Sequence, residues 1–155
     1  MVFLLTCPAF TEGAAIPAVY TCEGRDVSPP LAWTEPPPGT KSFVLISDDP
    51  DAPGKTWVHW VVYDLPAAER GLPEAYPPDD ERPDGTRQGM TDFGRTGYGG
   101  PCPPSGTHRY YFKLYALDAP LDLPAGVAKP QVEAAMRGHV LAQAALMGTY
   151  RRARR

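Results

Sequence analysis

Proline is the feature that most restricts how this chain can fold. Twenty of the 155 residues are proline, against a usual share of about 5%. Proline has a fixed φ and no backbone N–H, so it is excluded from helix interiors and central strands. The prolines fall between runs of apolar and aromatic residues. The sequence therefore predicts a folded, loop-rich chain whose regular elements lie between proline-rich segments.

Three long runs of β-prone residues lie between those segments. Residues 41–48 form a continuous run that predicts a strand buried on both faces. Residues 56–65 are rich in aromatic and β-branched side chains, and the short turn before them predicts an antiparallel neighbour. Residues 108–118 form the third long strand, and shorter strands are expected at 2–6 and 31–33.

The remaining segments are less regular until the end of the chain. Residues 66–106 show little apolar periodicity, and a long irregular stretch is often functional. From Lys129 onward, apolar residues recur at helical spacing as far as Met147. With Pro130 in the first turn and Gly148 as a stop, this pattern predicts a C-terminal helix over about 129–147.

Charge and hydropathy limit the classes of partner. The formal net charge is -3, which argues against nucleic-acid binding because that needs a basic surface. No run approaches the roughly 18 apolar residues of a membrane helix, and the first residues lack the basic region of a secretory signal. We therefore expect a single cytoplasmic domain over residues 1–155, with a frayed basic tail at 151–155.

The three cysteines are Cys7, Cys22 and Cys102. An odd number means that at least one is free or pairs between chains. A Cys22–Cys102 bridge is one option, but a reducing compartment favours thiols. No Cys-x-x-Cys spacing is present, so a structural zinc site is not expected.

The second long run carries a histidine, and strand alternation sorts its neighbours. Alternation places Trp57 and His59 on one face, and Val58 and Trp60 on the other. Asp49 ends the preceding strand, so we expect it near His59 across the hairpin.

A second histidine begins the third long run, directly after a rigid loop at residues 99–106. His108 and Tyr110 share one face of the strand, and Arg109 points away. If these faces converge, they form a pocket that contains two imidazoles, a phenol and a carboxylate inside an apolar rim. Such a pocket would suit a phosphate or carboxylate ligand. The predicted polar set is Asp49, His59, His108 and Tyr110, roofed by Trp57 and the Gly100–Pro104 loop.

Two catalytic readings compete with anion binding. A hydrolase would need a nucleophile, but the chain has no Gly-x-Ser-x-Gly elbow. Cys102 lies between Pro101 and Pro103, which deny it the helix N-terminus that would lower its pKa. Two imidazoles and a carboxylate could also hold zinc, through His59, His108 and Asp49.

Three ordered motifs resemble the phosphatidylethanolamine-binding protein (PEBP) family. Asp49–Pro53 followed by Trp57–Trp60 is similar to its first signature, and residues 100–110 are similar to its second. Residues 27–33 match its bacterial and archaeal branch, called Raf-kinase-inhibitor-like. The resemblance covers nearly the whole chain.

The resemblance implies a mainly β fold: an antiparallel β-sandwich with Greek-key links, long irregular loops and a C-terminal α-helix. It also implies a non-enzymatic regulatory protein, with no cofactor, whose small pocket accepts phosphate, carboxylate or a phospholipid headgroup. Carried over by position, the ligand-binding residues are Asp49, Trp57, His59, Gly100, Pro101, Pro103, His108 and Tyr110.

The resemblance also bears on residues outside the pocket and on partners. Asp51 and Arg109 match the motifs, and we expect them to pair and to pin the two motif segments together. Partners implied by the family are a kinase or a protease, and a second copy in a homodimer. The alternatives to the anion-binding interpretation are an enzyme using Asp49, His59 and His108, and an inhibitor acting through its surface loops.

Overall fold

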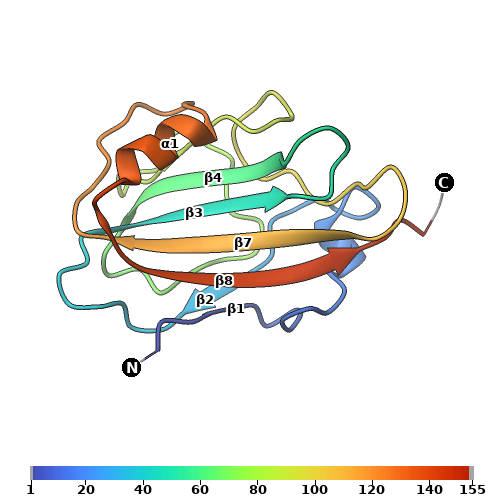
Figure 1. Cartoon of the computed structure of the whole chain (residues 1–155), viewed down its shortest axis with the longest axis horizontal. Helices are drawn as coiled ribbons and strands as arrows, with labels where there is room; N and C mark the ends of the chain where they lie inside the picture. The colour runs from blue at the N-terminus through green and yellow to red at the C-terminus, as the bar shows by residue number, and fades with distance from the viewer. Residues whose placement is uncertain (1, 154–155) are drawn as a thin grey trace.

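The computed structural model describes residues 2–153, and its main feature is an antiparallel sheet of five strands, here called the large sheet (Figure 1). The longest strands run side by side along the length of the molecule (Figure 1). In spatial order the strands are β6 (Arg87–Gln88), β4 (Trp57–Pro66), β3 (Ser42–Asp49), β7 (His108–Leu117) and β8 (Val140–Tyr150).

A small sheet and a helix cover the two faces of the large sheet. The small sheet consists of β1 (Leu5–Thr6), β2 (Leu31–Trp33) and β5 (Gly71–Leu72), in the order β1-β2-β5. The helix is α1 (Lys129–Met136), and a 3₁₀ turn, η1 (Ala18–Tyr20), precedes β2. The predicted mainly β fold, with antiparallel sheets and a helix near the C-terminus, is confirmed.

Alternating side chains of β3 pack into two separate hydrophobic cores, one on each face of the large sheet. Phe43 and Leu45 pack with the apolar residues of the small sheet. Val44 and Ile46 pack against the other face, where α1 contributes Val132. Every residue of β3 is buried, so the predicted burial on both faces is confirmed.

Near its start, β4 carries one residue more than the part of β3 that pairs with it. Ser47 pairs with Trp60 and Asp48 pairs with Val58, so His59 has no partner in the ladder. This is a β-bulge, and it shifts the alternation of side chains by one. Trp60 lies in the core beside the small sheet, whereas Val58 lies in the core beside α1. The prediction that these two side chains share a face is therefore wrong.

The C-terminal helix is much shorter than predicted. It ends at Met136, and Gly138 follows with φ of 82°, the left-handed backbone that commonly terminates helices. Val140–Tyr150 is the strand β8 and pairs along its length with β7. Buried and less buried residues alternate toward the end of this strand. The apolar positions that suggested a helical period therefore also fit the period of two of a strand, and pairing with β7 favours the strand.

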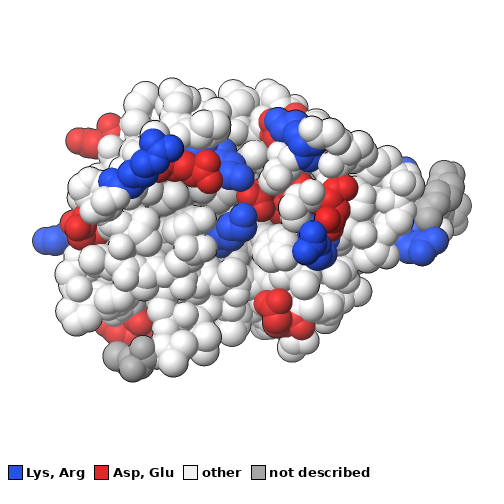
Figure 2. All heavy atoms as spheres, in the orientation of Figure 1, with Lys and Arg blue, Asp and Glu red and all other residues white. Residues whose placement is uncertain are grey.

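Apart from Pro66, which ends β4, the predicted irregular stretch at 66–106 contains only the two-residue strands β5 and β6. The predicted frayed tail lies partly outside the described residues, which end at 153. Among the described residues, no helix is long and apolar enough to cross a membrane. Basic and acidic side chains are interspersed on the face shown in Figure 2, without a large patch of one sign.

Cys22 and Cys102 form a disulfide, with their Cα atoms 5.4 Å apart. The expectation of free thiols at these two positions is wrong. Cys7 is the free cysteine and is buried. The disulfide joins the turn after η1 to the loop before β7, and beside it the Cys22 N–H donates to the Pro101 carbonyl at 3.1 Å.

Asp51 and Arg109 join the β3–β4 turn to the start of β7. The Arg109 side chain donates to both carboxylate oxygens, at 2.8 and 2.9 Å, and the Arg109 backbone N–H donates to Oδ2 at 2.8 Å. The structure thus contains the pair that the sequence suggested. The guanidinium lowers the pKa of Asp51 from 3.8 to about 2.

Removing the disulfide should destabilise the protein. The two cysteines are separated by 80 positions, so the Cys22→Ser/Cys102→Ser variant regains much freedom when unfolded and should lose about 2–4 kcal/mol of unfolding free energy. Denaturant titrations with and without a thiol reductant measure this. The reductant should destabilise the wild type and leave the variant unchanged; an equal unfolding free energy under all conditions would contradict the bridge.

The Asp51–Arg109 pair predicts an acid-sensitive contribution to stability. Because the folded pKa of Asp51 is lowered, the contribution is complete above about pH 4 and is lost as the pH falls toward 2. The difference in melting temperature between wild type and Asp51→Asn should be constant above about pH 4 and close by about pH 2. Arg109→Gln should behave in the same way. A difference that persists unchanged at pH 2 would argue against the pair.

Candidate functional site

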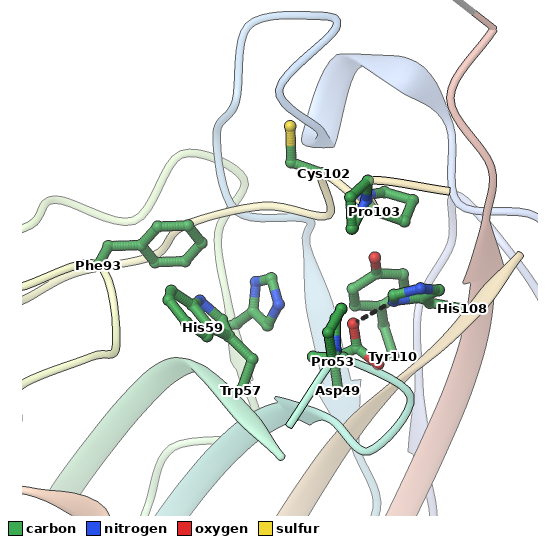
Figure 3. A pocket seen from close by; sticks show the side chains of 11 residues that line it. Asp49, Pro53, Trp57, His59, Phe93, Cys102, Pro103, His108 and Tyr110 are labelled. Atoms are coloured by element: carbon green, nitrogen blue, oxygen red, sulfur yellow. Dashed lines mark hydrogen bonds and ion pairs between the residues drawn. The ribbon is translucent and has the colours of Figure 1, made fainter. Parts of the chain in front are cut away.

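A cavity of about 340 Å³ opens at the end of the large sheet where β3 ends and β7 begins. Its polar side chains come from three adjacent strands, and its apolar ones come mainly from loops (Figure 3). The polar set is Asp49 from β3, His59 from β4, and His108 and Tyr110 from β7. The sequence placed these four side chains together, and the structure brings them into one cavity.

Asp49 orients His108. The Oδ2 atom of Asp49 lies 2.7 Å from Nδ1 of His108 (Figure 3), and the Asp51 N–H donates to its Oδ1, also at 2.7 Å. Asp49 is 3% exposed and His108 7%. Since a carboxylate accepts, Nδ1 of His108 carries the proton of this bond, and Nε2 is the nitrogen left for the cavity.

The bulge residue His59 is held by Gly99 rather than by Asp49. Nδ1 of His59 lies 2.7 Å from the Gly99 carbonyl oxygen, and the Gly99 N–H donates to the His59 carbonyl at 3.0 Å. A carbonyl oxygen can only accept, so Nδ1 carries the proton. Burial lowers the pKa of His59 below its ordinary value of 6.5. The ring is therefore neutral near pH 7.

Tyr110 lies between the two imidazoles. Its ring centre is 5.2 Å from that of His59, edge to face, and 6.3 Å from that of His108, nearly stacked. Burial, with the neighbouring Asp49 carboxylate, raises the pKa of Tyr110. The phenol consequently stays protonated and can donate a hydrogen bond.

The apolar wall centres on Trp57 and Phe93, whose rings meet edge to face at 5.7 Å. Phe93 packs on the backbone of Gly99, where a Cβ would lie 2.3 Å from the Phe93 ring. The remaining wall is formed by Ala52, Pro53, Cys102, Pro103 and Pro104. Phe93 was missed from the sequence, although a single aromatic inside the polar turn Thr91–Gly94 is a usable signal.

Six of the eight predicted ligand-binding residues line the cavity; Gly100 and Pro101 do not. The Gly100 N–H already donates to Oδ1 of Asp26 at 2.8 Å, and the Pro101 carbonyl accepts from the Cys22 N–H. A Cβ at position 100 would lie 2.2 Å from the Tyr20 carbonyl oxygen. These two residues hold the loop behind the cavity, and Asp51 and Arg109 also lie outside its lining.

The lining of the cavity bears on two alternatives to anion binding, a metal site and a cysteine nucleophile. Within residues 2–153, no group of three or more His, Cys, Asp or Glu is arranged to hold a metal ion. Cys102 lines the cavity, but its sulfur is in the disulfide. It therefore offers no thiolate in this state.

Comparison with known proteins matches nearly the whole chain. The family model for phosphatidylethanolamine-binding protein matches residues 6–151. A UPF0098 protein of Methanothermobacter thermautotrophicus is 54% identical over 144 residues, which cover 93% of this chain and 95% of the relative.

Two crystal structures share the fold. A PEBP homologue of Chlamydia trachomatis is 42% identical, with a TM-score of 0.90 over 97% of this chain and 98% of that one. YbcL of Escherichia coli, described as a member of the mammalian PEBP family, is 33% identical, with a TM-score of 0.86 and the same coverage. The chain therefore belongs to the phosphatidylethanolamine-binding protein family.

Proposed function

We propose that this protein is a binding module for small oxyanions of the phosphate or carboxylate type, and that it works without catalysing a reaction. The observation that carries the proposal is the convergence of His108, Tyr110 and His59 on one small cavity, with His108 held in place by Asp49. The oxyanion could be free in solution, or part of a lipid headgroup or of a phosphorylated group on another molecule.

The β7 wall supplies the hydrogen-bond donors for an anion. The Tyr110 phenol is protonated, and His108 becomes a donor at Nε2 when it takes up a proton. An imidazolium donates from both ring nitrogens, and the Asp49 carboxylate lies beside Nδ1, where it can balance such a charge. Hydrogen bonds in which one partner is ionised are roughly twice as strong as neutral ones.

The apolar wall strengthens these bonds by limiting water. Trp57 and Phe93 lie beside His59, and Pro103 lies near His108 and Tyr110 (Figure 3). Hydrogen bonds in a site of low dielectric constant are stronger than in water. The cavity of about 340 Å³ lies in the range of ligand pockets, so it suits an oxyanion with a short substituent.

A hydrolytic enzyme is less well supported. The Asp49–His108 pair has the geometry of the base and its orienting carboxylate in a catalytic triad. A triad also needs an activated nucleophile, and the described lining contains no serine, no threonine and no free thiol. The matching family and the relative from Methanothermobacter thermautotrophicus carry no enzymatic name.

Removing the His108 imidazole should abolish tight binding. In His108→Ala the cavity loses the imidazole that Asp49 holds in place, so affinity for phosphate should fall about 10- to 100-fold. Calorimetric titration with inorganic phosphate and acetate measures this, with a melting curve to verify folding. The matched control is His139→Ala: His139 pairs with Asp118 near the start of β8, at the sheet end away from the cavity. Unchanged phosphate affinity in a folded His108→Ala protein would overturn the proposal.

A further inference from the structure

The two cavity histidines differ in what holds their Nδ1 atoms. His108 faces the carboxylate of Asp49, which can balance a positive charge on the ring. His59 faces the neutral carbonyl of Gly99, which fixes the proton on Nδ1 but brings no charge. Within residues 2–153, Nε2 of His59 has no hydrogen-bond partner, although the side chain lines the cavity and the residue is only 4% exposed.

The surroundings of His59 oppose a second proton. Edges and faces of Phe93 and Tyr110 flank the ring, each with a centroid distance of 5.2 Å. Carboxylates on neighbouring elements favour the imidazolium, yet burial outweighs them and lowers the pKa of His59. The charged and titratable groups around it are Asp48 and Asp49 of β3, Asp26 of the segment after η1, and His108 and Tyr110 of β7.

A neutral His59 with its proton on Nδ1 presents a lone pair at Nε2. That lone pair needs a donor, and a fully ionised oxyanion has only acceptors. An oxygen of such an anion next to Nε2 would leave two buried acceptors unpaired, which sites of this kind penalise. The cavity thus sets the Asp49-paired imidazole of His108 and the phenol of Tyr110 against an acceptor at His59.

We propose that His59 accepts a hydrogen bond from the ligand, so that the cavity selects an oxyanion that carries a proton. This inference rests on the proposed anion-binding function and names its ligand class: a phosphate monoester in its monoanionic form, or phosphate itself. The P–OH donates to Nε2 of His59, and the ionised oxygens accept from His108 and Tyr110. Sulfate esters and phosphodiesters carry the same charge without the hydroxyl. An intact phospholipid headgroup is a phosphodiester, so it lacks the P–OH group.

The test compares three ligands that share an ethanolamine ammonium: phosphoethanolamine, ethanolamine O-sulfate and glycerophosphoethanolamine. At about pH 6, close to the second pKa of a phosphate monoester, roughly half of the phosphoethanolamine carries the P–OH proton. Calorimetric titration of the full chain should show phosphoethanolamine binding at least about 10-fold more tightly than the other two. Equal affinities would overturn this inference and leave the proposed function standing. No binding of any of the three would overturn both.

His59→Gln tests whether His59 is the group that accepts the hydrogen bond from the P–OH of the ligand. The amide of glutamine can turn its NH₂ toward the cavity and donate, so the preference for phosphoethanolamine should shrink to within about 2-fold. His139→Gln, which removes an imidazole at the other end of the sheet, should keep the wild-type preference. A preference that survives intact in folded His59→Gln would overturn the assignment.

The pH profile of the wild type decides the question even if the variant does not fold. As the pH rises above about 6, the monoester loses its proton, so its affinity should fall relative to that of the sulfate ester. At lower pH the two should converge, because protonation of His59 turns Nε2 into a donor. A ratio of affinities that does not change with pH would overturn the inference.

Discussion

Two consecutive buried carboxylates end strand β3, and their opposite orientations organise both faces of the large sheet. Asp48 is fully buried on the α1 side and contacts the ammonium groups of Lys113 and Lys129 at 3.2 and 2.8 Å. Asp49 turns to the other face and holds His108. A buried charge without a partner is strongly destabilising. One alternating pair of residues therefore anchors the helix on one side and orients a site histidine on the other.

The bulge in β4 determines which residue meets that histidine. With regular alternation, the placement of Trp60 in the core beside the small sheet would turn His59 toward α1. The extra residue frees His59 from the ladder with β3, and two hydrogen bonds to Gly99 then fix it against the cavity. Bulges commonly re-aim side chains beside functional sites. The polar set is thus assembled by a local departure from the strand pattern.

Features that depend only on neighbouring residues could be predicted from the sequence, whereas features that depend on contacts between distant segments could not. Alternation correctly separated His108 from Arg109, because the pairing of β7 with β8 is regular from His108 as far as Ala116. It failed at Val58 and Trp60 because a bulge depends on the register with another strand. The predicted helix was too long because the apolar residues after Gly138 fit both the helical period and the strand period of two. Pairing with β7 is what makes this segment a strand. The disulfide likewise depends on the folded proximity of distant segments.

Specificity in such a cavity depends on hydrogen-bond direction more than on residue type. The residue type at position 59 does not tell whether Nε2 of the histidine donates or accepts a hydrogen bond. The Gly99 carbonyl fixes the proton on Nδ1, and burial keeps the ring neutral, so Nε2 accepts. A carboxylate in place of that carbonyl would favour an imidazolium, as Asp49 can for His108. Two proteins with identical cavity residues can therefore prefer different ligands if the backbone behind one ring differs. In this family, the loop that carries Gly99 should accordingly influence ligand choice as strongly as the side chains that contact the ligand.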